Sequence, residues 1–289
     1  MTISTVEYLD TIDLLFVRQK INDFYNMDFA NVTPLTIQKS LFEIFCIKTS
    51  DGRVGINFPH CQSVIPKGEK FYRIWRGYDF YKALTEKSFR FSDLWNNPTA
   101  PINRMNKEGE PALYLCLRSP ETALFETGVK NDDIFTLFIY SAKEEIKVIE
   151  IYLGNRWSTG DGLNVEQQEK ANLLNDFLFR ELCRDVDENS KYLYKITNSI
   201  KHIFSNDKLY DCDGVRYISA ANSKPENICM RYPNFNRKIQ IDAIAKGVMT
   251  TEMKHYFIEV ATVESNGNIR TSLADENFLN TYIPAALYN

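Results

Sequence analysis

The chain has 289 residues, of which 44% are hydrophobic and 25% are charged, and its formal net charge at pH 7 is −4. This is ordinary globular composition in a chain long enough to bury a sizeable core. The slight excess of acidic residues argues against bulk attraction to nucleic acid or to an anionic membrane.

The N-terminal part of the sequence is predicted to be mainly helical. Apolar residues recur at helical spacing over residues 5–30, and a second helix is expected over Thr36–Ile47. The pair Asp51-Gly52 stands between two short apolar runs and predicts a β-hairpin. Prolines and a glycine then interrupt the pattern. We therefore expect a helical and hairpin extension over residues 1–66 and a main domain over residues 67–289.

The main domain is expected to mix strands and helices without regular βαβ alternation, which predicts an α+β fold. The expected elements, in chain order, are strands over 71–77 and 111–117, a helix that begins at Ser119, strands over 133–142 and 145–153, helices over 164–186 and 190–207, a strand over 213–220 and a C-terminal hairpin that turns at Asn266-Gly267. The consecutive strands over 133–142 and 145–153 are expected to pair with each other.

Cysteine and histidine usage gives little sign of metal or disulfide chemistry. The six cysteines include no CxxC pair, and His60, His202 and His255 form no matched set of metal ligands. The N-terminus has acidic residues within its apolar stretch, unlike a signal peptide, and no apolar run is long enough to span a bilayer. We therefore expect a cytoplasmic protein with reduced thiols. Its chemistry, if it is an enzyme, is expected to use carboxylate, Arg, Tyr or Ser groups.

Three segments carry a more specific pattern, although no P-loop, GxGxxG, HExxH or GxSxG sequence occurs. They are FYRIWRG (71–77), NRMNKEGEPALYLCLRSPETALFE (103–126) and DGVRYISAANSKPENICM (213–230). In this order they resemble the landmark blocks of the RES-domain family. The second block of that family has an Arg and an Asn, a Gly, a Tyr-Leu strand and an E-T-A-x-x-E helix start. The resemblance spans residues 68–232, with a long helical insertion before the third block.

The resemblance implies a fold and an activity. It implies an ADP-ribosyltransferase-like split β-sheet around an NAD cleft. It further implies a toxin-type enzyme that cleaves the nicotinamide–ribose bond of NAD by phosphorolysis or hydrolysis, with NAD as substrate, inorganic phosphate as a candidate co-substrate and no permanently bound cofactor. A cognate antitoxin is the implied partner, and a homo-oligomer is left open. Transfer of ADP-ribose to a protein, and a non-catalytic binding module, are the alternatives.

The acidic residues of the second block have different expected roles. Cleavage of the nicotinamide–ribose bond builds positive charge on the sugar, while nicotinamide leaves as a neutral molecule. A carboxylate beside the ribose would stabilise that charge. The resemblance assigns this catalytic role to Glu126, and the alternative is a solvated glutamate on a helix. Glu121 is nearer the helix N-terminus and is assigned to helix stabilisation.

The resemblance assigns phosphate binding to arginine. A guanidinium fork fits a diphosphate or a ribose edge at two points, and the family pattern gives this role to Arg73, with Arg104 as a second phosphate ligand. Arg76 competes with Arg73, but alternation along the strand points these two side chains to opposite faces. We favour Arg73. The alternative for Arg73 is a salt bridge on an edge strand.

The remaining matched residues carry polar or aromatic side chains. Tyr114 is expected either to stack on nicotinamide or to pack in the core. Asn106 is expected either to contact the dinucleotide or to cap its own loop. Ser219 is expected to hold ribose or phosphate, although Ile218 stands where the family usually has Pro. Asn227 matches a family Asn, and a turn or capping role is its alternative.

Overall fold

The structure is a computed structural model. It describes residues 5–48, 54–56, 60–86, 101–151, 162–204, 211–219, 227–231, 234–250, 255–263 and 269–283. The helices in this part of the chain are α1 (Thr5–Thr11), α2 (Leu14–Tyr25), α3 (Pro34–Phe45), α4 (Phe80–Thr85), α5 (Pro120–Thr127), α6 (Val165–Leu182), α7 (Tyr194–Phe204), α8 (Asn234–Lys238) and α9 (Glu276–Tyr282).

Strands make up the other half of an α+β fold, as predicted. They are β1 (Cys46–Lys48), β2 (Val54–Ile56), β3 (His60–Ile65), β4 (Lys70–Arg76), β5 (Ala112–Leu117), β6 (Ile134–Ala142), β7 (Ile146–Ile151), β8 (Gly214–Tyr217), β9 (Asn227–Arg231), β10 (Ile239–Met249), β11 (His255–Val263) and β12 (Ile269–Leu273). Strands β1 and β2 form the predicted small hairpin, and β11 and β12 form the predicted C-terminal hairpin. The turn residues of both hairpins lie outside the described residues.

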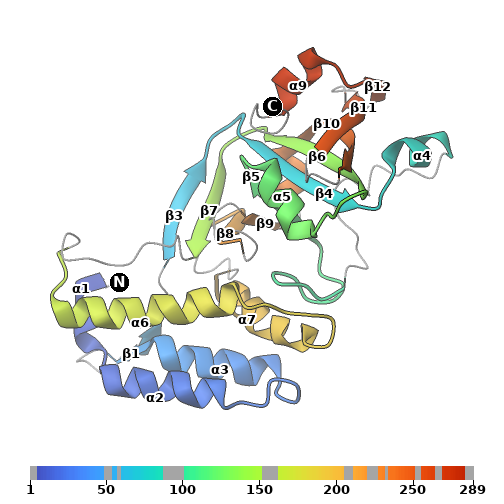
Figure 1. Ribbon diagram of the computed structural model, residues 1–289. Helices are drawn as coiled ribbons and strands as arrows, with labels where there is room; N and C mark the ends of the chain where they lie inside the picture. The colour runs from blue at the N-terminus through green and yellow to red at the C-terminus, as the bar shows by residue number, and fades with distance from the viewer. Residues whose placement is uncertain are drawn as a thin grey trace.

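The main sheet has ten described strands in the order β12-β11-β10-β6-β4-β5-β9-β8-β7-β3. All neighbours are antiparallel except β7 and β8, which are parallel. One buried cluster takes side chains from β3, β4, β5, β6, β7, β9 and β10. The sheet curls around this cluster, and Figure 1 shows the curl of the strands.

The predicted pairing of the strands over 133–142 and 145–153 is wrong. Strand β6 pairs with β10 and β4, and β7 pairs with β3 and β8. Both strands are buried along almost their whole length, so each is covered on both faces and has a neighbouring strand at each edge. Because the sheet curls, residues 143–145 can link two strands that are separated in the sheet by β4, β5, β9 and β8.

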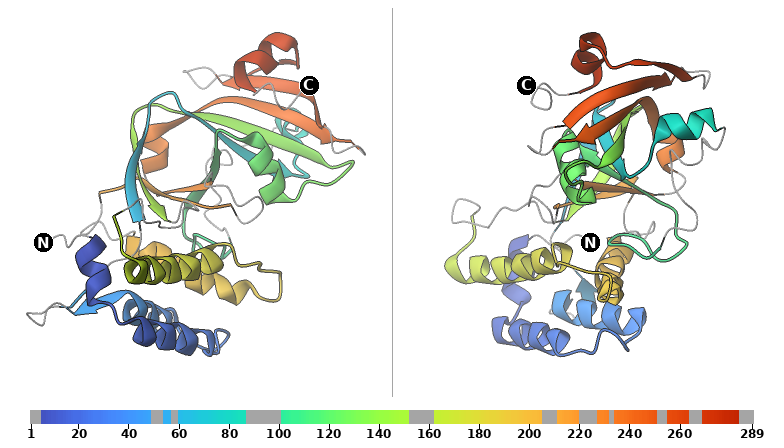
Figure 2. Two further views of the ribbon diagram at one scale, coloured as in Figure 1. Left: turned by 60° about the vertical axis from the view of Figure 1, so that its left-hand side comes forward. Right: turned by 45° about the vertical axis from the view of Figure 1, so that its right-hand side comes forward.

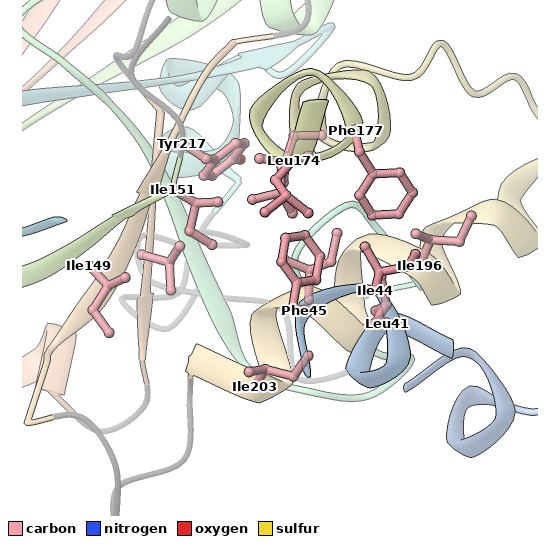
Figure 3. Close-up of a cluster of buried hydrophobic side chains, with 14 of the residues drawn as sticks. Leu41, Ile44, Phe45, Ile149, Ile151, Leu174, Phe177, Ile196, Ile203 and Tyr217 are labelled. Carbon is pink, nitrogen blue, oxygen red and sulfur yellow. The ribbon is translucent and has the colours of Figure 1, made fainter. Parts of the chain in front are cut away.

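A layer of helices lies beneath one side of the curled sheet, and both further views agree on this arrangement (Figure 2). Helices α1, α2 and α3 pack with α6 and α7 in a single cluster that also includes Ile149, Ile151 and Tyr217 of the sheet (Figure 3). Phe177 of α6 is central to it, with ring centroids 5.2 Å from Phe24 and 5.9 Å from Phe45. The N-terminal helices α1, α2 and α3 therefore share a core with the rest of the described chain, and His60–Ile65 supply β3 of the main sheet.

Helix boundaries follow from local sequence. Thr33 accepts a hydrogen bond from the N–H of Thr36 at the start of α3, with Pro34 in the first turn. Asn164 and Gln167 form a capping box at the start of α6. These signals explain why the predicted helices begin within a few residues of their expected positions.

Gly247 is required by the packing of β10 at a β-bulge. A Cβ atom at this position would lie 2.3 Å from Cζ and 2.7 Å from Cε2 of Phe135, which is fully buried. We expect Gly247→Ala to lower the free energy of unfolding by about 1–3 kcal/mol because the ring must move. Urea unfolding measures this, and adding Phe135→Leu should recover part of the loss. An unchanged midpoint for Gly247→Ala would contradict this packing.

Candidate functional site

Helix α5 places Glu126 over one face of the sheet, beside β4 and β5. Ala123 and Leu124 pack against Tyr72 of β4 and Cys116 of β5, so α5 lies on that face of the two strands. Ser119 accepts a hydrogen bond from the N–H of Thr122 at 3.1 Å and begins the helix as predicted. Gly128, with φ of 59°, ends it in the left-handed conformation that glycine favours. Glu126 therefore stands in the last turn.

Three residues predicted for the site meet at one carboxylate oxygen. Ser219 Oγ donates a hydrogen bond to Oε1 of Glu126 at 2.5 Å, and Nδ2 of Asn227 donates to the same oxygen at 2.8 Å. Both donors belong to buried residues, whereas Glu126 is exposed. Two fixed donors thus orient a carboxylate that solvent reaches, and such charge-assisted hydrogen bonds are stronger than neutral ones.

The strand register explains why these residues converge. Cys116 of β5 is opposite Asn227 of β9, and Asn227 is opposite Tyr217 of β8, so the three side chains share a face. Ser219 follows two residues after Tyr217. The thiol of Cys116 donates to Oδ1 of Asn227 at 3.3 Å, which leaves the amide Nδ2 for Glu126.

Two further residues lie near Glu126 that sequence reasoning missed. Burial raises the pKa of the Tyr217 phenol well above its ordinary value, and the charge of Glu126 adds to the shift while Arg104 opposes it. Burial also raises the pKa of the Cys183 thiol to about 11, with Arg104 and Glu126 acting in opposite directions. Both groups are therefore neutral at pH 7. Because Cys183 caps the C-terminus of α6, this end of α6 is near enough to Glu126 for its charge to act on the thiol.

Arg104 lies on the same side of the sheet as Glu126. Its guanidinium donates to the carbonyl oxygens of Leu182 at 2.5 Å and Arg184 at 3.1 Å, and it stacks over the ring of Tyr194 at 5.7 Å. A cation is favourable at a helix C-terminus because the dipole there is negative. A guanidinium has five N–H donors, and these two carbonyls use two of them.

Asn106 does not have a free side chain for a ligand. It is 2% exposed. Its Nδ2 donates to the carbonyls of Pro101 and Lys107 at 2.9 and 2.8 Å, and its Oδ1 accepts from the hydroxyl of Tyr114 at 2.8 Å. Both N–H groups and the carbonyl are occupied. These contacts are those expected of the loop-capping alternative, and contact of Asn106 with a dinucleotide stays a prediction that they do not support.

Tyr114 ties the same loop to β5. Its hydroxyl accepts a hydrogen bond from the N–H of Met105 at 2.7 Å while donating to Asn106. Burial raises the pKa of this phenol well above its ordinary value. The half-buried ring packs against the cluster shared with the helical layer. Through these contacts Tyr114 anchors residues 105–106. Stacking of its ring on nicotinamide stays a prediction.

The predicted convergence of Arg73 with Glu126 is wrong. Tyr72 is opposite Cys116 in the sheet and faces α5, so the next residue along β4 points to the other face. There the guanidinium of Arg73 shares a hydrogen bond with the phenol of Tyr140 and stacks over Trp75 at 5.1 Å. Burial lowers the pKa of Arg73 and raises that of Tyr140 to about 12. Arg73 is thus an interior residue of the curled sheet.

Arg76, the competitor of Arg73, is engaged elsewhere. Its Nε lies 2.7 Å from Oδ2 of Asp133 in an ion pair at the end of β4. Glu121, in the first turn of α5, accepts a hydrogen bond from Ser119 Oγ at 3.1 Å, which agrees with its assignment to the helix N-terminus. Arg104 therefore remains the candidate for phosphate binding on the Glu126 side of the sheet.

Glu110 gives the loop after Arg104 a pH dependence. Burial opposes ionisation of Glu110, but hydrogen bonds from Lys201 Nζ and the N–H of Lys107 lower its pKa. A carboxyl whose pKa is lower in the folded state stabilises the fold above its unfolded pKa, and this contribution is lost as the pH falls through the folded pKa. We expect the stability difference between the wild type and Glu110→Gln to be constant above about pH 5 and to shrink below it. Denaturant unfolding across pH measures this, and a difference that grows on acidification would contradict it.

Searches among known proteins add no identification. The sequence matches no protein-family model, and no curated protein is significantly similar to it. Among the described residues, no group of three or more His, Cys, Asp or Glu side chains is arranged to hold a metal ion. None of the described helices combines the length and the apolar character that crossing a membrane requires.

Proposed function

We propose that this protein cleaves the bond between nicotinamide and ribose in NAD, with Glu126 as the carboxylate that stabilises the developing sugar cation. The observation that carries the proposal is the meeting of Glu126, Ser219 and Asn227, which come from separate segments, at one carboxylate oxygen. The resemblance of three sequence blocks to RES-domain proteins supplies the substrate. An ADP-ribosyltransferase-like arrangement of the curled sheet belongs to the same proposal.

The chemistry follows from the way Glu126 is held. Ser219 and Asn227 occupy Oε1, and within the described residues no hydrogen bond reaches Oε2. Oε2 is therefore the oxygen that would face the ribose and accept a hydrogen bond from a ribose hydroxyl. Orienting the carboxylate before the substrate arrives removes the cost of reorganising it as the sugar becomes positive, which is the main source of electrostatic catalysis. Nicotinamide departs as a neutral molecule, so its departure requires no protonation by the enzyme.

Arg104 is the guanidinium that we assign to the diphosphate. Its contacts with Leu182 and Arg184 fix the planar group while leaving other N–H donors for a phosphate oxygen. Water or inorganic phosphate then attacks the sugar carbon from which nicotinamide has left. A toxin role and an antitoxin partner are part of the family resemblance and rest on it alone.

Product analysis tests the proposal and separates it from its alternatives. Purified protein is incubated with NAD in buffers with and without inorganic phosphate, and the products are weighed by mass spectrometry. Free nicotinamide with ADP-ribose indicates hydrolysis, and nicotinamide with a phosphorylated ADP-ribose indicates phosphorolysis. Label from the adenine part of NAD on a protein band indicates ADP-ribosyl transfer. Binding of NAD with no product would contradict the proposal and favour a binding module.

Substitution of Arg73 tests whether Arg104, rather than Arg73, binds the diphosphate. Because its side chain lies on the sheet face opposite α5 and contacts Tyr140, Arg73→Met is expected to leave KM for NAD within about twofold of wild type. Arg104→Met is the matched comparison and is expected to raise KM. Steady-state nicotinamide release measures both. A larger increase of KM for Arg73→Met than for Arg104→Met would restore Arg73 to the substrate site.

A further inference from the structure

Helix α7 presents three buried polar side chains to one loop. Thr197, Asn198 and Lys201 are 2%, 4% and 7% exposed, although polar residues on a helix usually face solvent. Their spacing places them on one side of the helix. All three contact residues 103–110, the loop that carries Arg104.

The contacts reach both ends of that loop. Thr197 Oγ1 donates to the carbonyl oxygen of Arg104, and Asn198 Nδ2 donates to the carbonyl of Asn103 at 2.8 Å. Lys201 Nζ lies 2.7 Å from Oε1 of Glu110 in an ion pair whose lysine side chain is 8% exposed. The backbone on which the Arg104 side chain stands is therefore held by α7.

The other face of α7 belongs to the core of the helical layer. Ile196, Ile200 and Ile203 are buried in the same cluster as Leu41 and Ile44 of α3. Figure 3 labels Ile196 and Ile203 together with the two α3 residues. This cluster links the N-terminal helices, which lie outside the sequence blocks used for the functional prediction, to the Arg104 loop. The sheet holds the loop from the opposite side, through the hydroxyl of Tyr114.

We propose that Thr197, Asn198 and Lys201 are positioning residues that set the guanidinium of Arg104 for its ligand, so that the helical layer determines the geometry of the site. This inference rests on the proposed function, because it takes the diphosphate of NAD as that ligand. The three side chains act through Arg104 and touch no reacting atom. Helices α1, α2 and α3 then serve the site by packing in the cluster that buries the apolar face of α7.

Thr197 allows the sharpest test because two conservative variants separate its hydroxyl from its shape. Thr197→Val keeps the shape and removes the donor, and it is expected to raise KM for NAD about tenfold while kcat changes less than about threefold. Thr197→Ser keeps the hydroxyl and should restore KM to near the wild-type value. In an Arg104→Ala background, Thr197→Val should add no further increase in KM, since it acts through the missing side chain. An equal increase in both backgrounds would overturn the proposal.

A second readout does not depend on turnover. Amide hydrogen exchange over residues 103–110 should be about tenfold faster in Thr197→Val than in Thr197→Ser. If the wild type releases no nicotinamide, the proposed function fails, and this exchange still decides whether α7 holds the loop. Equal exchange in the two variants would overturn the inference. If exchange is faster in Thr197→Val but its KM for NAD equals that of the wild type, α7 only stabilises the loop. That result would also overturn the inference.

Discussion

Glu126→Gln is expected to lower kcat for nicotinamide release from NAD by about 100- to 1000-fold. The variant keeps an oxygen that can accept hydrogen bonds from Ser219 and Asn227, so the side chain is expected to stay in place. It loses the negative charge, and that charge interacts more strongly with the positively charged sugar of the transition state than with NAD. KM should therefore change much less than kcat.

Glu121→Gln is the matched control for this prediction. Glu121 is on the same helix, but it contacts Ser119 at the N-terminus rather than the Ser219–Asn227 pair. Nicotinamide release by Glu121→Gln is expected to stay near the wild-type rate, and circular dichroism should show the same helix content in both variants. Equal losses in the two variants would mean that α5 responds to any removal of charge, and Glu126 would have no special role.

Phe45→Ala is expected to produce the largest loss of stability, about 3–5 kcal/mol in the free energy of unfolding. Phe45 is fully buried at the end of α3, and its ring lies 5.9 Å from that of Phe177 in α6. Removing the ring leaves a cavity between α3 and α6, in the core that also includes Tyr217 (Figure 3). Urea unfolding followed by fluorescence and by circular dichroism measures the change.

Phe16→Ala is the control, because Phe16 is 53% exposed on α2 and its loss should change stability by less than about 0.5 kcal/mol. If the helical layer and the sheet share one core, both probes should show a single transition that moves together in Phe45→Ala. A sheet transition that stays in place while the helices melt earlier would instead indicate two independent units.

Most elements of the fold could be predicted because their signals are local. Ser119-Pro120 marks the start of α5, the apolar face of α6 repeats at helical spacing, and the hairpin pairs Asp51-Gly52 and Asn266-Gly267 stand between strands that do pair. The partners of β6 and β7 were not predictable in this way. Their short connection is typical of a hairpin, and only the curl of the complete sheet, which buries both strands, directs them to other neighbours.

The candidate site also has one part that could be predicted from sequence and one part that depends on packing. Glu126, Ser219 and Asn227 were matched by pattern, and the register of β5, β8 and β9 brings them together. Alternation along β4 could say that Arg73 and Arg76 face opposite sides, but it could not say which side carries α5. That is decided by the packing of Ala123 and Leu124.

The contacts between α7 and the loop that carries Arg104 could not be predicted from the sequence. Thr197, Asn198 and Lys201 form a polar face, which in a single sequence indicates a solvent-exposed surface. Their burial depends on a loop that lies about 90 residues earlier in the chain and covers them. Contacts of this separation are tertiary and leave no periodic pattern in either segment.

Cleavage of NAD is followed with NAD labelled on the nicotinamide ring and the purified 289-residue chain. The label is followed from NAD to free nicotinamide over time, with Glu126→Gln run in parallel at the same protein concentration. We expect the wild type to convert the label to free nicotinamide at a rate proportional to enzyme concentration, and the variant to do so about 100- to 1000-fold more slowly. If the label remains in NAD with the folded wild-type protein, both with and without phosphate, this protein does not cleave the nicotinamide–ribose bond.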